Sequence, residues 1–190
     1  MRTVVINGSP RKMGNTAAML KEMAKFADEE GSRTDYLDLV DLRIADCKAC
    51  MKCREQGECA QKDDLAMLST VIKEADLLML GSPVYMGAET GLMKCFTDRL
   101  FSFSAGVSPT ELESRLTGKR KAIALFTCEM ANGDRLYSYL SAGYARMLGS
   151  VLNCEPVLTA IVPGANPAWG LRQSPKAAET LELSRRFIKG

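Results

Sequence analysis

The sequence contains no histidine among its 190 residues, no long apolar run and no strong excess of charge. Without an imidazole the chain has no Cys/His metal site, no histidine general base and no Ser-His-Asp triad. No apolar stretch reaches the roughly 20 residues that a membrane-spanning helix needs. The formal net charge is only +2. The longest basic cluster, Lys119-Arg120-Lys121, precedes an apolar run, so we expect a solvated strand entry there and not a nucleic-acid surface.

The cysteine count and the N-terminus indicate the compartment. Met1-Arg2 leads directly into Thr3–Ile6 and a polar glycine loop, which is not the pattern of a signal peptide. The seven cysteines are an odd number, so a disulfide scaffold is not expected. We therefore expect a cytoplasmic protein whose thiols are free, metal-bound or redox-active. Neither a membrane nor a nucleic acid is expected as a partner.

Strand and helix signals alternate along the chain. The expected strands are 3–6, 34–40, 75–81, 121–127 and 155–162. The expected helices are 16–30, 64–74, 90–103, 135–148 and 175–188, with the third strand breaking at Ser82-Pro83 and the fourth helix stopping at Gly149. This alternation predicts a single α/β domain over residues 1–190. Its core is a doubly wound, five-stranded parallel sheet with helices on both faces, and a cysteine-rich insertion lies at about 44–62.

Sheets of this kind bind ligands at the carboxyl ends of their strands, where the strand order reverses. The loop after the first strand, Gly8–Thr16, has the chemistry of a phosphate site: unpaired amides of a helix N-terminus, polar donors, positive charge and glycines. The residues concerned are Ser9, Arg11, Lys12, Gly14, Asn15 and Thr16. The P-loop ending and the three-glycine dinucleotide fingerprint are both absent. The alternative is a plain strand–helix turn capped by Thr16.

The loops after the third and fourth strands are the other candidates. Gly81–Gly87 combines glycines with Tyr85 and Met86, which suit the wall of a flat aromatic cofactor; the alternative for Tyr85 is a partly buried packing role. The loop Thr127–Gly133 is polar, and Cys128 within it is a candidate cofactor contact.

Four cysteines lie within 13 residues in the pattern Cys47-x2-Cys50-x2-Cys53-x5-Cys59. Such a compact quartet suits a [4Fe–4S] cluster, because a tight loop can wrap one cube. Structural zinc usually uses two Cys-x2-Cys pairs separated by a longer insert. Zinc and metal-free thiols remain the alternatives. We expect Cys95 and Cys154 to be small core residues.

Three motifs together resemble the iron–sulfur flavoprotein family, part of the flavodoxin-like NADPH-dependent FMN reductase superfamily. They are the loop Gly8–Thr16, the quartet leading into Asp63-Asp64, and Gly81–Tyr85 followed by Lys94-x3-Asp98-Arg99. The match covers about residues 1–100, and beyond them only the strand–helix pattern and the 127–133 loop support it. The resemblance implies a flavin-dependent oxidoreductase that binds FMN.

The resemblance also implies site residues and partners. The FMN phosphate would lie in the Ser9–Thr16 loop. The ring would be bordered by Pro83, Val84, Tyr85, Met86 and Gly87, with Thr127 and Cys128 in the closing loop. Cys47, Cys50, Cys53 and Cys59 would hold a [4Fe–4S] cluster. A homodimer or homotetramer would pass electrons from a carrier such as ferredoxin to oxygen, a peroxide or a quinone.

Two alternatives stay open at this stage. One is an NAD(P)H-dependent FMN or quinone reductase that has no cluster. The other is a non-enzymatic zinc- or redox-sensing module. Trp169, the only tryptophan, is expected to pack in an ordinary way.

Overall fold

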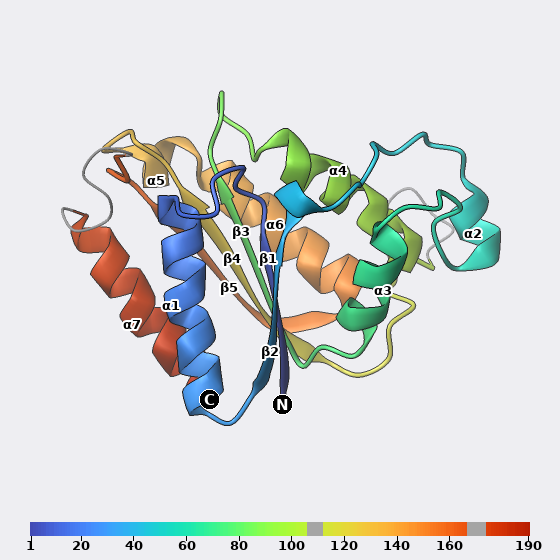
Figure 1. The fold of residues 1–190 in the computed structure, drawn as a ribbon, viewed down its shortest axis with the longest axis horizontal. Coiled ribbons are helices and arrows are strands. Elements are labelled where there is room, and N and C mark those ends of the chain that lie inside the picture. Colours follow the sequence, from blue (N-terminus) through green and yellow to red (C-terminus); the bar gives the residue numbers. More distant parts are fainter. Residues whose placement is uncertain (106–111, 167–173) are drawn as a thin grey trace.

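The computed structural model describes residues 1–105, 112–166 and 174–190 (Figure 1), so Trp169 lies outside the described residues. Its elements, in chain order, are β1 (Arg2–Asn7), α1 (Asn15–Glu29), β2 (Arg33–Asp38), the 3-10 turn η1 (Leu39–Asp41), α2 (Lys52–Gln56), α3 (Leu65–Lys73), β3 (Leu77–Pro83), α4 (Gly91–Arg99), the 3-10 turn η2 (Leu100–Phe103), β4 (Arg120–Thr127), α5 (Gly133–Leu136), α6 (Ser138–Leu152), β5 (Cys154–Val162) and α7 (Pro175–Lys189). None of the described helices is both long and apolar enough to cross a bilayer.

The five strands form one parallel sheet in the order β2-β1-β3-β4-β5. This confirms the predicted flavodoxin-like architecture. The strand order reverses at β1, which pairs with β2 on one side and β3 on the other, so the ligand-binding edge is expected where these strands end. The register brings three strand ends together there: Asn7 pairs with Gly81, and Pro83 pairs with Thr127.

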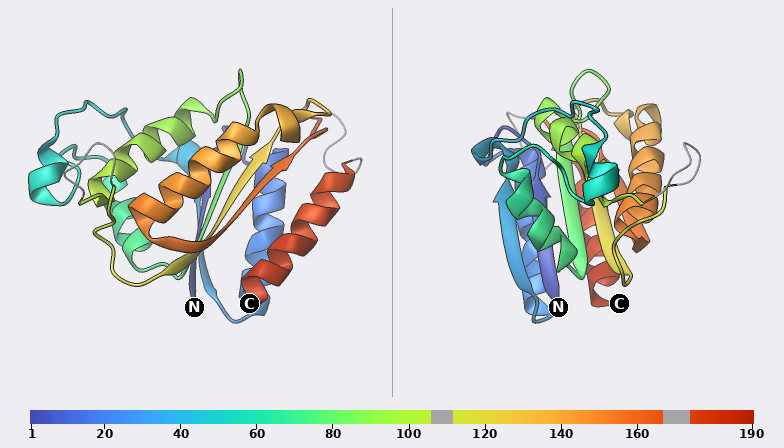
Figure 2. Two further views of the ribbon diagram at one scale, coloured as in Figure 1. Left: turned by 180° about the vertical axis from the view of Figure 1, so that it is seen from behind. Right: turned by 90° about the vertical axis from the view of Figure 1, so that its right-hand side faces the viewer.

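Helices cover both faces of the sheet, with α1 and α7 on one side and α3, α4 and α6 on the other (Figures 1 and 2). The central strand β3 shows why. Leu77 and Met79 belong to the cluster that packs against α1 and α7. Leu78 and Leu80 belong to the cluster on the opposite face. A strand buried on both faces reads as a continuous apolar run, which is how it is predicted from the sequence.

Several element ends differ from the prediction. Strand β3 continues through Pro83, which is tolerated because a strand end requires no further N–H donor. Helix α6 passes through Gly149 and ends at Leu152, where Asn153 follows as the C-cap with a left-handed φ of +54°. The expected 135–148 helix is divided into α5 and α6. The expected 90–103 helix is α4 capped by Thr90, followed by the tighter turn η2.

Candidate functional site

The loops after β1, β3 and β4 are fastened together at the carboxyl edge of the sheet. The N–H of Gly8 donates to the carbonyl of Gly81 at 2.8 Å, and the N–H of Val84 donates to the carbonyl of Thr127 at 2.9 Å. The hydroxyl groups of Thr16 and Thr127 share a buried hydrogen bond of 2.7 Å. The three predicted loops therefore form one continuous edge.

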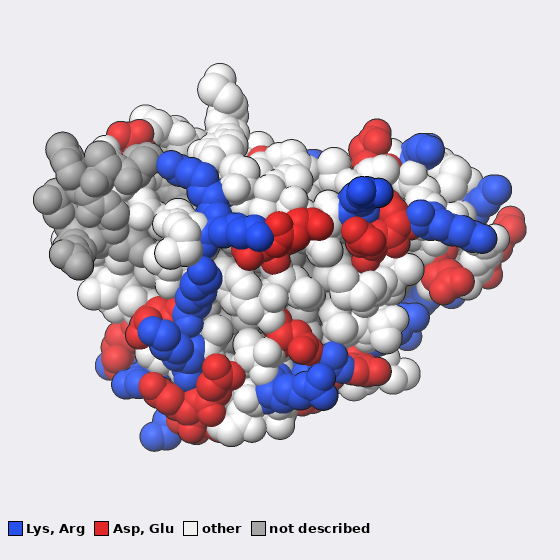
Figure 3. All heavy atoms as spheres, in the orientation of Figure 1, with Lys and Arg blue, Asp and Glu red and all other residues white. Residues whose placement is uncertain are grey.

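The loop Gly8–Thr16, here called the phosphate loop after its predicted ligand, combines the N-terminus of a helix with exposed positive charge. Helix α1 begins at Asn15, and its N-cap, Gly14, provides no side-chain cap. Its first-turn N–H groups therefore have no intrahelical partner. An open hollow of about 450 Å³ lies here, lined by Arg11, Lys12, Met13, Gly14 and Asn15. Figure 3 shows basic side chains along the face of α1 leading up to this loop. An anion is the ligand that this arrangement suits.

Most of the predicted phosphate-loop side chains also shape the loop itself. The buried hydroxyl of Ser9 accepts from the N–H of Arg11 at 3.1 Å. The amide of Asn15 donates to the carbonyl of Asn166 at 3.2 Å. Lys12 pairs with Asp41, whose hydrogen bond raises the pKa of Lys12. Within the described residues the exposed Arg11 side chain has no ion pair, so its charge is available to a ligand.

The loop after β3 carries a protruding two-residue turn, residues 85–88. Tyr85 and Ala88 exchange both backbone hydrogen bonds, and the residues between them, Met86 and Gly87, have φ of +50° and +85°. The Met86 side chain is fully exposed and Tyr85 is 43% exposed, so neither is a core residue. The hydroxyl of Tyr139 donates to the carbonyl of Gly87 and supports the turn. The 85–88 turn stands above the sheet edge (Figure 1).

Cys128 is buried in the loop after β4, directly against Gly133. A Cβ on Gly133 would come within 2.1 Å of the Cys128 sulfur, so glycine is required for this packing. Burial, with a smaller effect of Asp134, raises the pKa of the Cys128 thiol to about 11. The thiol is therefore neutral at physiological pH, and the contact of its sulfur with Gly133 packs the loop.

Sequence reasoning missed Thr90 and Ser82. The Thr90 hydroxyl accepts from the N–H of Met93 at 3.1 Å, as an N-cap, and donates to the carbonyl of Gly8 at 2.6 Å. The Ser82 hydroxyl accepts from the N–H of Thr90 at 3.0 Å. A threonine before an amphipathic helix is a recognisable cap signal. The hydrogen bond from Thr90 to the Gly8 carbonyl forms only because two loops meet in the fold, so no neighbouring residue in the sequence predicts it.

The four clustered cysteines lie in an exposed segment, here called the cysteine loop (residues 43–64), which contains α2. All four line one small pocket, the thiol pocket, together with Arg99 and Phe101. Cys47 and Cys50 are exposed, whereas Cys53 and Cys59 are half-buried. Burial and the neighbouring Cys59, Cys50 and Cys47 thiols raise the pKa of the Cys53 thiol. The four thiols thus share the lining of one pocket.

In the described ranges, no three potential ligands converge closely enough to hold a single metal ion. A [4Fe–4S] cube attaches each thiolate to a different iron, so its four ligands surround the cluster instead of converging on one point. The four thiols that line one pocket are the donor set that such a cube takes, one thiolate to each iron.

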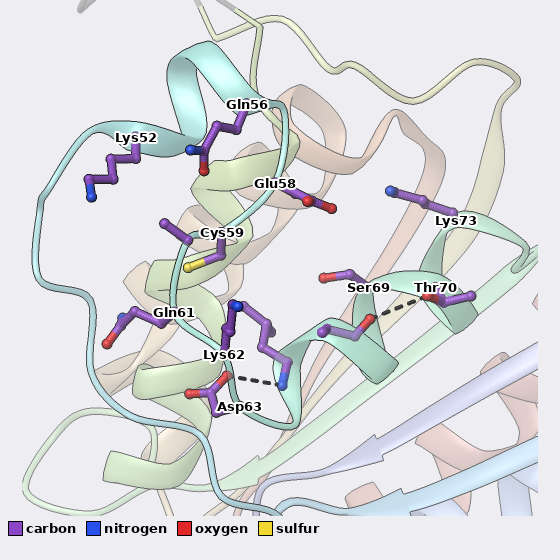
Figure 4. Close-up of a pocket in the computed structure, with 13 residues that line it drawn as sticks. Lys52, Gln56, Glu58, Cys59, Gln61, Lys62, Asp63, Ser69, Thr70 and Lys73 are labelled. Atoms are coloured by element: carbon purple, nitrogen blue, oxygen red, sulfur yellow. Dashed lines mark hydrogen bonds between the residues drawn. The ribbon is translucent and has the colours of Figure 1, made fainter.

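The cysteine loop is closed at its base by two aspartates. The Asp63 carboxylate accepts from the N–H groups of Ala45 and Leu65, at 3.0 and 3.2 Å. Asp64 accepts from the N–H of Arg43 at 2.7 Å. Figure 4 shows the segment with Cys59, Gln61 and Asp63 passing in front of α4 and bordering a wide, open polar hollow. That hollow lies beside the cysteine loop and away from the phosphate loop.

Comparison with known proteins decides the family. The sequence pattern of the NADPH-dependent FMN reductase family matches residues 1–158. The chain belongs to this family. An iron–sulfur flavoprotein of Archaeoglobus fulgidus is 31% identical over 168 residues, covering 86% of this chain and 79% of that protein. One of Methanocaldococcus jannaschii is 38% identical over 99 residues, covering 52% of this chain and 51% of its own length.

The fold of this FMN reductase family member is shared with solved structures. The NAD(P)H:quinone oxidoreductase of Methanothermobacter marburgensis superposes with a TM-score of 0.74 at 17% identity, covering 100% of this chain and 98% of that one. The resemblance to the NADPH-dependent FMN reductase family that the sequence motifs indicated is confirmed. The chain spans about half the length of the first curated relatives that it matches.

The remaining cysteines of this family member confirm one expectation and correct another. All seven cysteines are free thiols. Cys154 is buried, as predicted, and burial raises the pKa of its thiol to about 12. Cys95 is only half-buried on α4, so its assignment as a core residue is wrong. It lies between Lys94 and Phe96, at the margin of the apolar helix face.

Proposed function

We propose that this chain is an FMN-binding electron-transfer oxidoreductase whose cysteine loop carries a [4Fe–4S] cluster. Residues 1–190 would form one FMN-binding domain with the cysteine-rich insertion. The observation that carries the proposal is that Cys47, Cys50, Cys53 and Cys59 line a single pocket. When bound, the flavin and the cluster supply the electron-accepting and electron-donating chemistry, while the protein positions them and tunes their potentials.

The residues of the carboxyl edge have distinct proposed roles. Arg11 and the unpaired amides of the first turn of α1 bind the FMN phosphate, and Gly14 allows the backbone to approach it. Ser9 and Thr16 hold the loop in shape through the bonds described above. The isoalloxazine ring is bordered by Pro83, Val84, Tyr85, Met86 and Gly87, and by the loop that begins at Thr127 and Cys128.

Electrons would pass between a carrier such as ferredoxin, or NAD(P)H, and an acceptor such as oxygen, a peroxide or a quinone. The family name supports NAD(P)H as a redox partner. The names of the iron–sulfur relatives support the cluster. We further propose a homodimer or homotetramer in the cytoplasm, where reducing conditions keep thiols such as these free.

The test is the ultraviolet–visible spectrum of anaerobically purified protein, with iron, sulfide and zinc assays on the same sample. Flavin bands, a broad iron–sulfur shoulder and about four irons per chain are expected. Flavin without iron, together with direct reduction by NAD(P)H, would instead identify a reductase without a cluster. Zinc without flavin would identify a metal-sensing module.

A pair of cysteine variants sharpens the test. Cys50→Ser removes an exposed thiol of the thiol pocket and should abolish the iron shoulder while the flavin bands remain. Cys95→Ser makes the same atomic change outside the residues that line this pocket. It should retain both signals. Equal iron content in the two variants would contradict the assignment of the quartet as cluster ligands.

A further inference from the structure

Arg99 is a fully buried cation at the carboxyl end of α4, and its guanidinium group points into the cysteine loop. The side chain has no exposed surface. Its two terminal nitrogens donate to both carboxylate oxygens of Asp63, one of them at 2.9 Å. They also donate to the carbonyl of Ala45 at 3.1 Å and the carbonyl of Gln61 at 3.4 Å. A further bond of 3.2 Å reaches the sulfur of Cys59.

These contacts matter because the cysteine loop has no core of its own. Within residues 43–64, all of which are described, no residue is buried. Arg99 lies outside the loop and takes the place of such a core. Its guanidinium group connects Ala45 and Asp63, near the two ends of the loop, with Cys59, a proposed cluster ligand. The planar fork of arginine can hold several acceptors at once, which the ammonium group of lysine does not reproduce.

A buried charge of this kind is expensive unless it is neutralised and hydrogen-bonded; the two terminal nitrogens of Arg99 meet this need, while its buried Nε has no partner among the described residues. Asp63 provides the neutralising charge, and its own side chain is only 16% exposed. Removing either partner would leave an uncompensated charge in a water-poor position. The ion pair therefore fixes where the Asp63 end of the loop lies relative to α4.

We propose that Arg99 is the positioning residue of the cysteine loop, holding it in the shape in which the four thiols share one pocket. Its N–H···S bond places positive charge next to Cys59 alone among the four ligands. The positioning role does not depend on the proposed [4Fe–4S] function, whereas the effect on the reduction potential described next rests on it. Hydrogen bonds to cluster sulfurs favour the more negative, reduced state, so Arg99 raises the reduction potential.

The chain contains a matched control in Arg120. It is also a buried arginine, 5% exposed, and donates to the carbonyls of Ala75, Leu152 and Thr117. None of these acceptors belongs to the cysteine loop. Arg120→Lys therefore reproduces the loss of a buried guanidinium fork without touching the thiol pocket.

The first measurement is hydrogen–deuterium exchange of the FMN-loaded, iron-free protein. Arg99→Lys should speed exchange of amides in residues 43–64 by about tenfold, because several charge-assisted hydrogen bonds are lost. Arg120→Lys should leave this segment at the wild-type rate. Unchanged exchange in Arg99→Lys would overturn the positioning role. FMN retention shows whether each variant is folded.

The second measurement is the midpoint potential of the reconstituted cluster, which should be lower in Arg99→Lys than in wild type and Arg120→Lys. Faster loop exchange with an unchanged potential would overturn the effect on the cluster.

If wild-type protein takes up no iron while exchange still depends on Arg99, the proposed function fails and the positioning role stands. If Arg99→Lys fails to fold, Cys59→Ala removes only the sulfur acceptor: faster exchange at residues 59–63 supports the proposal, and unchanged exchange overturns it.

Discussion

Replacing Gly133 by alanine probes how closely the loop after β4 is packed at the carboxyl edge of the sheet. The new Cβ would lie 2.1 Å from the Cys128 sulfur and 3.6 Å from the Cys128 Cβ. Optimal contacts lie at roughly 3.5–4.0 Å, so the sulfur alone would have to move by about 1.5 Å. Forcing a buried atom aside costs about 1–3 kcal/mol. For a chain of this length, each kcal/mol lowers Tm by about 2–4 °C.

Gly133→Ala should change the free energy of unfolding in the opposite direction when the Cys128 sulfur is absent. Gly133 is the first residue of the short helix α5 and its φ is not left-handed, so alanine at this position should stabilise the fold by about 0.4–1 kcal/mol by restricting the unfolded chain. In a Cys128→Ala background, Gly133→Ala should therefore be neutral or stabilising, although Cys128→Ala alone costs roughly 1 kcal/mol. Urea unfolding of all four proteins, flavin-free, iron-free and reduced, gives the coupling energy. Additive effects of the two substitutions would refute the steric argument.

Two further predictions concern the ends of α4. Burial raises the pKa of Asp63, but hydrogen bonds from Arg99 and from backbone N–H groups outweigh it and hold the pKa below its ordinary value of 3.8. The resulting stability is complete above pH 3.8 and is lost as the pH falls through the lower, folded-state value. Urea titrations of iron-free protein from about pH 5 to about pH 2 should show wild type losing stability more steeply than Asp63→Asn, and parallel curves would count against the pairing. Thr90→Ala should cost about 2–3 kcal/mol, because it removes a helix cap and leaves the buried Gly8 carbonyl without its donor. Thr90→Ser should recover most of this loss and of FMN retention in gel filtration, whereas equal stability of the two variants would contradict the assignment.

The architecture was predictable because its signals are local. The apolar run of β3 predicts a strand buried on both faces, and the glycine-rich segment after β1 predicts a loop at the switch point. Helix ends were less predictable. Gly149 is a stop signal by sequence, yet α6 continues through it to Leu152 because glycine is tolerated within a helix, and the left-handed Asn153 ends the helix instead.

The site was predictable in its composition but not in its connections. Spacing alone indicates that the four cysteines act together. In contrast, Arg99 follows Asp98 in a charged dipeptide that resembles any solvent-exposed helix end. Its burial depends on Asp63, which is 36 residues away in the sequence. Likewise, Thr16 meets Thr127 across 111 residues. Contacts of this kind arise only when loops from different strands are folded together.

Helix α4 connects the phosphate loop with the cysteine loop, so its length sets the position of one loop relative to the other. Thr90 fastens its beginning to the phosphate loop, and Arg99 fastens its last residue to the cysteine loop. The helix has nine residues, and each contributes about 1.5 Å of rise and about 100° of rotation. Inserting or deleting one residue would swing Arg99 out of line with Asp63 while Thr90 stayed in place. The length of this helix is therefore a fixed dimension of the molecule: its exposed positions should tolerate substitution, whereas an insertion or a deletion should not be tolerated.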